Sequence, residues 1–295
     1  MYSNGDGRGS ASLKKVTVPD LRARKGMGPS IAMVTAYDFT MARLMDEAGV
    51  DIMLVGDSLG MVIQGLPTTL PVTLEEIAYH GRAVARGSAR AHVVGDMPFM
   101  SYQVSPEQAV GSAGKLIKDG GLEAVKLEGG EEIAEHVRRI VRAGIPVMGH
   151  VGLQPQSVHA LGGFKMQGRG GEAAAKIVGD ARAIADAGAY AIVLEAIPPD
   201  VARQVTALVG VPTIGIGAGS ACDGQVLVCT DLLGLSRGPS PKFAKHFAEI
   251  GDAIVGATSR YVAEVRAGTF PSSEHAFKPN RLDDAVADRV DLTKN

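Results

Sequence analysis

The segments Asp51-Ile-Met-Leu-Val-Gly-Asp57-Ser58 and Ala91-His-Val-Val-Gly-Asp96 decide the fold, because each is a short apolar run that ends in Val-Gly-Asp. Near-continuous apolar runs of this length are typical of strands buried on both faces of a parallel sheet. In α/β enzymes the carboxyl ends of such strands carry the chemistry. Two carboxylates at one rim repel each other unless a cation or proton lies between them. The repeat therefore predicts a divalent-metal site.

Outward from these segments, β-branched runs alternate with amphipathic segments between about residues 30 and 235, which indicates repeated βα units. This pattern predicts an α/β fold and favours a closed (β/α)8 TIM barrel, although spacing alone leaves an open doubly wound sheet possible. The eight predicted strands are 31–37, 51–57, 91–96, 124–128, 146–151, 191–196, 212–217 and 225–233.

Helix start signals separate several of these strands. Thr73-Leu-Glu-Glu76 has the form of a capping box, and Ser105-Pro-Glu-Gln108 combines an N-cap, an early proline and a reciprocal Gln. Apolar residues at 133, 137, 140 and 141 form one stripe that ends before Gly144. We therefore expect helices after the second, third and fourth strands.

Length and composition are those of a single enzyme-sized domain. The chain has 295 residues, 45% of them hydrophobic, which suffices for a large core. We expect a flexible extension at 1–15, a barrel at 16–270 that includes a closing C-terminal helix over 243–265, and a polar tail at 271–295.

Charge and cysteine content exclude several classes of function. The net charge is −2 and the basic residues are scattered, so we expect small-molecule substrates and no nucleic-acid partner. No stretch reaches the roughly 20 apolar residues of a membrane span. Cys222 and Cys229 form no recognisable disulfide or zinc pattern. These features predict a cytoplasmic protein without a membrane partner.

Polar residues gather at the ends of the predicted strands. Burying such side chains without partners would cost several kcal/mol. Oxygen donors without a His or Cys cluster favour Mg²⁺. The candidate site residues are Asp57, Ser58, Asp96, Lys126, Glu128, His150 and Glu195.

Each candidate also has a structural interpretation. Asp57 and Asp96 could instead be helix caps, although their identical contexts favour metal binding. Lys126 could neutralise a substrate oxyanion or form a structural ion pair. Glu128 could be a third metal ligand or hold a metal-bound water. Glu195 follows an apolar run and could be a general base or a loop cap.

Three further features have weaker signals. His150 could be an auxiliary catalyst or a hydrogen-bonded packing residue. Gly215-Ile-Gly-Ala-Gly219 could hold a phosphate, but we favour a tight loop. The glycine-rich loop at 162–171 could be a lid or a flexible connection.

The order of these motifs resembles the ketopantoate hydroxymethyltransferase family, also named 3-methyl-2-oxobutanoate hydroxymethyltransferase, from about residue 15 to residue 275. Any one motif is weak, but nine in the same order are highly specific. They are Thr35-Ala-Tyr-Asp38, Leu54-Val-Gly-Asp-Ser-Leu-Gly60, Thr69-Leu-Pro-Val-Thr73, Gly95-Asp-Met-Pro-Phe99, Val125-Lys-Leu-Glu-Gly-Gly130, Gly149-His-Val-Gly-Leu-Gln-Pro-Gln156, Gln167-Gly-Arg169, Gly215-Ile-Gly-Ala-Gly219 and Pro241-Lys-Phe243.

The resemblance implies a barrel of the phosphoenolpyruvate/pyruvate type and a hydroxymethyltransferase. Such an enzyme transfers a hydroxymethyl group from the co-substrate 5,10-methylenetetrahydrofolate to 3-methyl-2-oxobutanoate, forming 2-dehydropantoate for pantothenate and coenzyme A synthesis. It also implies Mg²⁺ and a homodecamer. By this likeness Asp57, Asp96 and Glu128 bind the metal, Asp57, Ser58, Asp96 and Lys126 bind the keto acid, and Glu195 accepts the proton.

The implied chemistry agrees with the residues. A 2-oxo acid chelated to Mg²⁺ would lose its C3 proton to Glu195 as a stabilised enolate, which attacks the folate-borne carbon. Lys165 and Arg169 on the glycine-rich loop could attract the folate's glutamate carboxylates. The rival functions are a Mg²⁺-dependent 2-oxo acid lyase of the isocitrate lyase and phosphoenolpyruvate mutase type, and a non-catalytic ligand-binding barrel.

Overall fold

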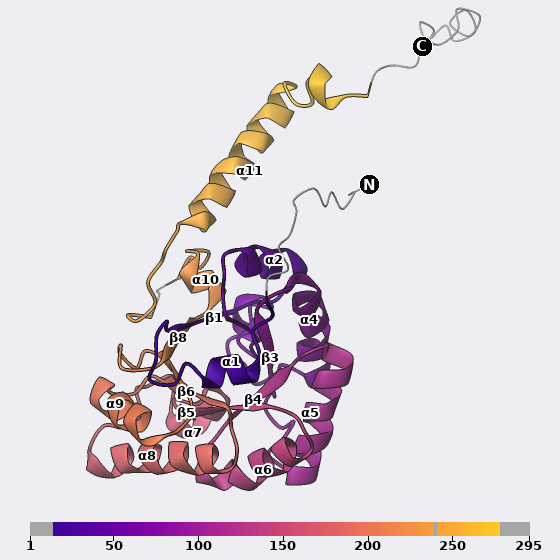
Figure 1. The fold of residues 1–295 in the computed structure, drawn as a ribbon. Coiled ribbons are helices and arrows are strands. Elements are labelled where there is room, and N and C mark those ends of the chain that lie inside the picture. The colour runs from indigo at the N-terminus through magenta and orange to yellow at the C-terminus, as the bar shows by residue number, and fades with distance from the viewer. Residues whose placement is uncertain (1–13, 239–240, 278–295) are drawn as a thin grey trace, which may run out of the picture. The chain divides into compact units, whose positions relative to one another are not determined.

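The computed structural model describes residues 14–238 and 241–277. Its strands pair in parallel in chain order, and β1 closes on β8 to form a barrel (Figure 1). This confirms the closed barrel and excludes the open doubly wound sheet. The strands are β1 (Ile31–Thr35), β2 (Ile52–Val55), β3 (His92–Asp96), β4 (Ala124–Glu128), β5 (Val147–Gly152), β6 (Ala191–Glu195), β7 (Thr213–Ile216) and β8 (Gly224–Leu227).

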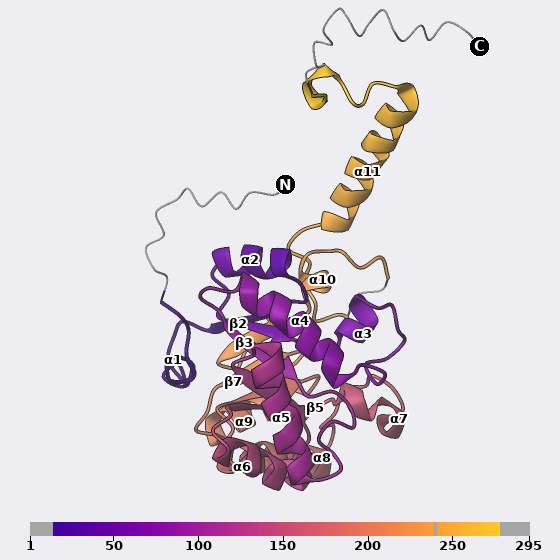
Figure 2. The same cartoon turned by 90° about the vertical axis from the view of Figure 1, so that its right-hand side faces the viewer.

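Helices surround the barrel, and neighbouring helices along the chain pack on one another (Figures 1 and 2). Within the described residues no helix separates β7 from β8, so the chain departs from eight regular βα units. The helices are α1 (Val18–Arg22), α2 (Phe39–Glu47), α3 (Leu59–Val62), α4 (Leu74–Gly87), α5 (Pro106–Gly120), α6 (Ala134–Arg142), α7 (Val158–Leu161), α8 (Gly171–Asp186), α9 (Pro199–Leu208), α10 (Cys229–Leu232) and α11 (Ile250–Ala267), with short 3-10 turns η1 (Glu131–Ile133), η2 (Pro155–Ser157) and η3 (Ser273–His275).

The predicted caps are present, with one correction. Thr73 and Glu76 form the reciprocal capping box of α4. Ser105 caps α5 by accepting from the Gln108 amide. The side chain of Gln108 instead accepts from the Val104 amide at 3.0 Å, so the expected reciprocal contact to Ser105 is wrong.

The eighth predicted strand was too long. Residues 225–233 contain β8, but Cys229–Leu232 is helix α10. A short apolar run fits a buried strand and a buried helix equally well by periodicity, so the sequence could not separate them. The seven other predicted strands overlap the observed ones and differ only at their ends.

Alternation along the strands divides the core into two parts. Side chains such as Val34, Val55 and Val93 face outward and pack against the helices. Their neighbours, such as Met33, Leu54 and Val94, fill the barrel interior. The interior is therefore a packed core and not a pore, as is usual for this fold.

Helix α1 packs at the amino end of the barrel. Thr17 and Asp20 form its capping box. Val16 and the fully buried Leu21 belong to the same apolar cluster as the barrel interior. This helix was not among the elements predicted from the sequence. The predicted extension at 1–15 lies outside the described residues except for Lys14 and Lys15, and the Lys15 ammonium donates to the Ala91 carbonyl at 2.7 Å.

The chain from Glu249 onward forms a second compact unit. Its helix α11 begins at Ile250, so the predicted helix start at 243 is wrong, and Phe243 lies in a loop instead. None of the residues of α11 is buried. That the helix closes the barrel stays a prediction, and the predicted tail at 271–295 lies largely outside the described residues. No described helix is long and apolar enough to cross a membrane.

Candidate active site

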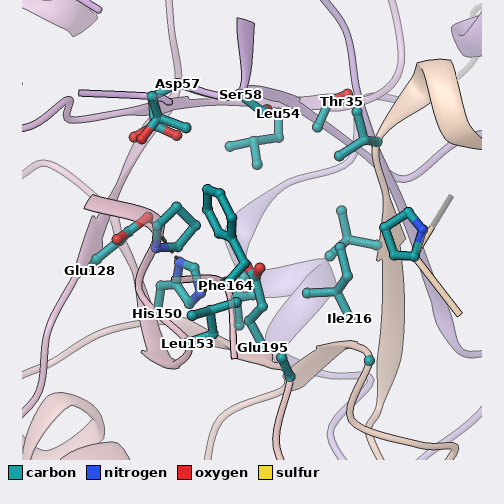
Figure 3. A pocket seen from close by; sticks show the side chains of 18 of the residues that line it. Thr35, Leu54, Asp57, Ser58, Glu128, His150, Leu153, Phe164, Glu195 and Ile216 are labelled. Carbon is teal, nitrogen blue, oxygen red and sulfur yellow. Dashed lines mark ion pairs between the residues drawn. The ribbon is translucent and has the colours of Figure 1, made fainter. Parts of the chain in front are cut away.

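A cavity of about 600 Å³ lies at the carboxyl ends of the strands (Figure 3). Its lining contains all of the polar residues that the sequence singled out at the strand ends. They are Asp57, Ser58, Asp96, Lys126, Glu128, His150 and Glu195. Residues as distant along the chain as Asp57 and Glu195 thus meet in one place, as the barrel hypothesis requires.

Strand pairing explains this meeting. Inward-facing positions alternate along each strand, so Lys126 and Glu128 on β4 point to the same side. The register places Asp96 of β3 beside Lys126 and places Glu128 beside His150 of β5. Gly152 of β5 in turn pairs with Glu195 of β6. The polar layer is therefore the upper layer of the barrel interior.

The Val-Gly-Asp repeat brings two carboxylates together. The Asp57 amide donates to Asp96 Oδ2 at 3.0 Å, and the Lys126 ammonium lies 2.7 Å from Asp96 Oδ1. A Cβ added at Gly56 would lie 2.8 Å from Ser58 Oγ and 3.3 Å from Asp96 Oδ2. A side chain at position 56 would therefore crowd the Ser58 hydroxyl and the Asp96 carboxylate, and glycine leaves room for both.

Negative charge is in excess around Asp57. Burial, followed by the charges of Asp96 and Glu128, raises the pKa of Asp57 well above its usual value. Burial also raises the pKa of Asp96, although Lys126 opposes this. Burial lowers the pKa of Lys126, but the three carboxylates outweigh it and raise that pKa, so the ammonium stays charged. Lys126 alone does not balance these three carboxylates, and with His150 and Glu195 included the cavity has two cations for four carboxylates.

His150 lies between two carboxylates (Figure 3). Its Nδ1 is 3.5 Å from Glu128 Oε1 and its Nε2 is 3.2 Å from Glu195 Oε2. The latter contact has the distance of an ion pair without the alignment of a hydrogen bond. Burial and Lys126 disfavour the imidazolium, yet Glu128 and Glu195 outweigh them and raise the pKa of His150 to about 9. Burial raises the pKa of Glu128, but His150 and Lys126 reverse this and lower it.

Three polar residues at the site received no role from the sequence. Tyr37 places its hydroxyl 2.8 Å from Ser58 Oγ. Gln156 donates to Asp57 Oδ2 at 2.9 Å, and Tyr102 places its hydroxyl 2.9 Å from Gln156 Oε1. All three are buried. Tyr37 and Gln156 do lie within motifs quoted above, but their contacts come from loops whose paths the sequence does not reveal.

The mouth of the cavity is apolar. Phe164 points toward the middle of the cavity in Figure 3, and it is 50% exposed. Phe243 packs over Gly217, whose φ of 62° turns the loop after β7. Glycine at 217 thus serves a tight turn, as the simpler interpretation expects. Other apolar residues of the lining are Met61, Val62, Leu153, Pro155, Met166, Ile216 and Pro241.

The glycine-rich loop is tied to the site. The Gln167 amide donates to the Ala196 carbonyl at 2.9 Å, directly after Glu195. Phe164 and Met166 line the cavity, whereas Lys165 and Arg169 are exposed. The loop therefore presents apolar groups inward and cations to solvent.

The donor set fits Mg²⁺ with few protein ligands. Within residues 14–238 and 241–277, no group of three or more His, Cys, Asp or Glu side chains is placed to hold a metal ion. Asp57 and Asp96 supply two adjacent carboxylates; Asp96 is paired with Lys126, whereas no described cation lies in an ion pair with Asp57. Mg²⁺ commonly binds through one or two carboxylates and keeps waters or substrate oxygens. The Oε2 atom of Glu128 already accepts a hydrogen bond from the backbone amide of Gln156 at 3.1 Å.

Comparison with known proteins decides the family. The family model described as ketopantoate hydroxymethyltransferase matches residues 15–273. The chain belongs to the ketopantoate hydroxymethyltransferase family. It is 57% identical to the 3-methyl-2-oxobutanoate hydroxymethyltransferase of Anaeromyxobacter sp. (strain Fw109-5), with 91% of this chain and 89% of that protein covered. The same enzyme of Moorella thermoacetica is 54% identical, with 91% and 100% covered.

Solved structures show the same barrel type at low identity. Phosphonopyruvate hydrolase in complex with oxalate and Mg²⁺ matches with a TM-score of 0.57 at 16% identity, covering 88% of this chain and 92% of that one. A 2,3-dimethylmalate lyase of the phosphoenolpyruvate mutase/isocitrate lyase superfamily matches with a TM-score of 0.57 at 20% identity, covering 88% of each chain. At this identity the likeness shows the fold alone, and it confirms the expected phosphoenolpyruvate-type barrel of the ketopantoate hydroxymethyltransferase family.

Proposed function

We propose that this protein transfers a hydroxymethyl group from 5,10-methylenetetrahydrofolate to 3-methyl-2-oxobutanoate, forming 2-dehydropantoate. The observation that carries the proposal is the pairing, in one cavity of a family member, of a buried charged layer with an apolar mouth. The charged layer suits a small oxo acid. The apolar mouth suits a larger aromatic co-substrate.

Lys126 and Ser58 would bind the keto acid. The Lys126 ammonium is buried beside Asp96 and keeps its charge, so it can neutralise a carboxylate or an oxyanion. Ser58 Oγ is held by Tyr37, which fixes its direction. Two fixed contacts would orient the acid's oxygens and thereby its C3 carbon.

Glu195 would remove the C3 proton. Its side chain is 18% exposed, and it lines the cavity at the end of β6. Its neighbour His150 lies 3.2 Å away and would help to hold the carboxylate in place for proton transfer. His150 would therefore support the base and not replace it.

Asp57 and Asp96 would hold Mg²⁺, and Glu128 would hold one of its waters or complete the ligand set. When bound, the ion supplies Lewis-acid stabilisation of negative charge on the oxo acid. The support is the surplus of buried negative charge at these residues, which a divalent cation would compensate.

The folate would occupy the apolar mouth. A cavity of about 600 Å³ is much larger than a five-carbon acid needs. Phe164 and Phe243 offer half-exposed rings on which a pterin could stack. Lys165 and Arg169 are exposed on the same loop and would attract the glutamate carboxylates. Reversing both charges should weaken folate binding in direct titrations, and an unchanged affinity would remove this assignment.

Assembly and compartment are proposed by resemblance. Large apolar side chains are exposed on α2 and α4, among them Leu44 at 55% and Tyr79 at 64%, as an assembling subunit would have. We expect a homodecamer in the cytoplasm. Sedimentation of the purified protein tests the assembly, and a monomeric mass would reject it.

The function is tested by turnover. We expect 2-dehydropantoate to form from the keto acid and methylenetetrahydrofolate with Mg²⁺ and not with a chelator present. Folate-independent cleavage of a 2-oxo acid would instead indicate a lyase. Ligand binding without any turnover would indicate a binding protein.

A further inference from the structure

Gln156 lies where three strand ends of the polar layer converge. It is in the turn η2 after β5, and its side chain is only 6% exposed. The turn begins with Pro155, which restricts the backbone just before it. Gln156 belongs to one of the family motifs, but the proposed chemistry assigns it no role.

Every hydrogen-bonding group of the Gln156 amide is used. Its Nε2 donates to Asp57 Oδ2 at 2.9 Å and to the Met97 carbonyl at 3.0 Å. Its Oε1 lies 2.9 Å from the Tyr102 hydroxyl and accepts from Gln103 Nε2 at 3.1 Å. A buried amide with all partners in place has one orientation, and here the donor faces the carboxylate because carboxylate and carbonyl only accept.

The same residue also holds a second acid. The Gln156 backbone amide donates to Glu128 Oε2 at 3.1 Å. The Tyr102 hydroxyl, which lies against the Gln156 side chain, is also 2.8 Å from the Glu128 carbonyl. Gln156 and Tyr102 therefore connect the end of β2 to the end of β4.

The hydrogen bond from Gln156 holds only one of the two oxygens of the Asp57 carboxylate. Among the described residues, the side-chain hydrogen bond to Asp57 reaches Oδ2, and none reaches Oδ1. A carboxylate fixed through one oxygen presents the other in a set direction. Hydrogen bonds from outer residues commonly orient metal-binding side chains in this way.

We propose that Gln156, backed by Tyr102, is a positioning residue that fixes the Asp57 and Glu128 carboxylates in the arrangement that binds the divalent ion. The inference rests on the proposed function in that Asp57 is taken as a metal ligand. It adds a residue that touches neither the substrate nor the ion.

The test measures metal binding directly. Mn²⁺ is titrated into the purified full-length protein without substrates, and free Mn²⁺ is followed by electron paramagnetic resonance. Gln156→Met keeps the side-chain length but removes all four hydrogen bonds. We expect its Kd for Mn²⁺ to rise about tenfold. Gln154→Met makes the same change at a half-buried position two residues earlier that contacts Ser157, and its Kd should match that of the unaltered protein.

Tyr102→Phe is a milder second variant for the case that Gln156→Met does not fold. It removes one hydroxyl and should raise the Kd about threefold at an unchanged melting temperature, because Gln156 then loses one of its restraints. A folded Gln156→Met protein with a Kd within twofold of the unaltered one would overturn the proposal. If that variant does not fold, an unchanged Kd in Tyr102→Phe overturns it. Turnover of the unaltered protein, measured separately, tests the proposed function itself.

Discussion

The two ends of the barrel both contain buried carboxylates, but only the amino end balances them. There Asp51 lies 2.8 Å from Arg24 and 2.9 Å from Arg90, and it accepts from the Ala32 amide. Burial alone would raise the pKa of Asp51, yet these partners lower it. Asp223, held by Lys25 and by backbone amides, behaves in the same way.

At the carboxyl end the balance is reversed. The four carboxylates of Asp57, Asp96, Glu128 and Glu195 share two cations, Lys126 and His150. Burial and the other acids raise the pKa of Asp57 well above its usual value. Matched carboxylates, which have enough cationic and amide partners to lower their pKa, stabilise the fold. Unmatched carboxylates, whose pKa is raised, lower the stability of the fold. The difference separates structural acids from functional ones more clearly than residue type or position does.

The largest expected effect is at Glu195, where chemistry should fail without loss of the metal site. Glu195→Gln keeps the shape and removes the base, so product formation should fall about 1000-fold. Hydrogen–deuterium exchange at C3 of the keto acid should be lost in parallel, with Mn²⁺ binding retained. Surviving exchange would move the role of base elsewhere, with His150 as the first alternative.

Asp57→Asn tests whether the unmatched acid costs stability. We expect Mn²⁺ binding and turnover to fall by about 100-fold or more. Because the folded-state pKa of Asp57 is raised, its ionised form destabilises the metal-free protein at neutral pH, and a neutral amide removes this penalty. The metal-free variant should therefore melt at the same temperature as the unaltered protein or higher. A clear drop in melting temperature would contradict the comparison.

Asp51→Asn makes the same chemical change at the balanced end. It leaves Arg24 and Arg90 without their carboxylate, so the free energy of unfolding should decrease by about 2 kcal/mol. Turnover of the folded enzyme should change less than about twofold, since the site is remote. Urea unfolding and steady-state assays measure the two effects. A variant that loses activity at unchanged stability would invert the assignment of the two ends.

The smallest expected effect is on how the free energy of unfolding depends on pH in the acidic range. Asp51 and Asp223 have lowered pKa values in the folded protein, so their stabilisation is complete above the unfolded value of about 3.9 and is lost as pH falls through the folded values. Asp57 acts in the opposite sense, because its protonation relieves repulsion. In the metal-free protein, the free energy of unfolding should depend less steeply on pH between about pH 5 and pH 3 in an Asp51→Asn, Asp223→Asn double variant than in the unaltered chain. Equal slopes would show that these acids are not matched.

Much of this site could be predicted because acidic residues at strand ends have a recognisable local sequence pattern. A carboxylate after an apolar run, repeated as Val-Gly-Asp, marks two strands and the rim that they share. The period of two on β4 also placed Lys126 and Glu128 on one side. The residues alone suggested metal binding, oxyanion neutralisation and proton transfer as one of two interpretations of each side chain. The family resemblance favours these roles, which stay proposals.

What could not be predicted depends on long-range packing. Tyr102 and Gln156 lie in irregular segments, and their partners are 26 to 99 residues distant along the chain. The sequence also did not predict that β7 and β8 follow each other without a helix in the described chain, nor the short helix α10. Apolar runs such as the one around Cys229 carry no periodic signal that separates strand from helix.

Leu21 and Val16 cover the amino end of the packed barrel interior, and the cavity opens at the carboxyl end through the apolar mouth. The charged layer lies deeper in the cavity than the apolar mouth, so a folate bound in the mouth would block the path of the keto acid to the charged layer. On the proposed chemistry, catalysis is then compulsorily ordered: the oxo acid enters first and its hydroxymethylated product departs last. The product 2-dehydropantoate should inhibit competitively against the keto acid but not against the folate, and competition with the folate would show that a second route exists.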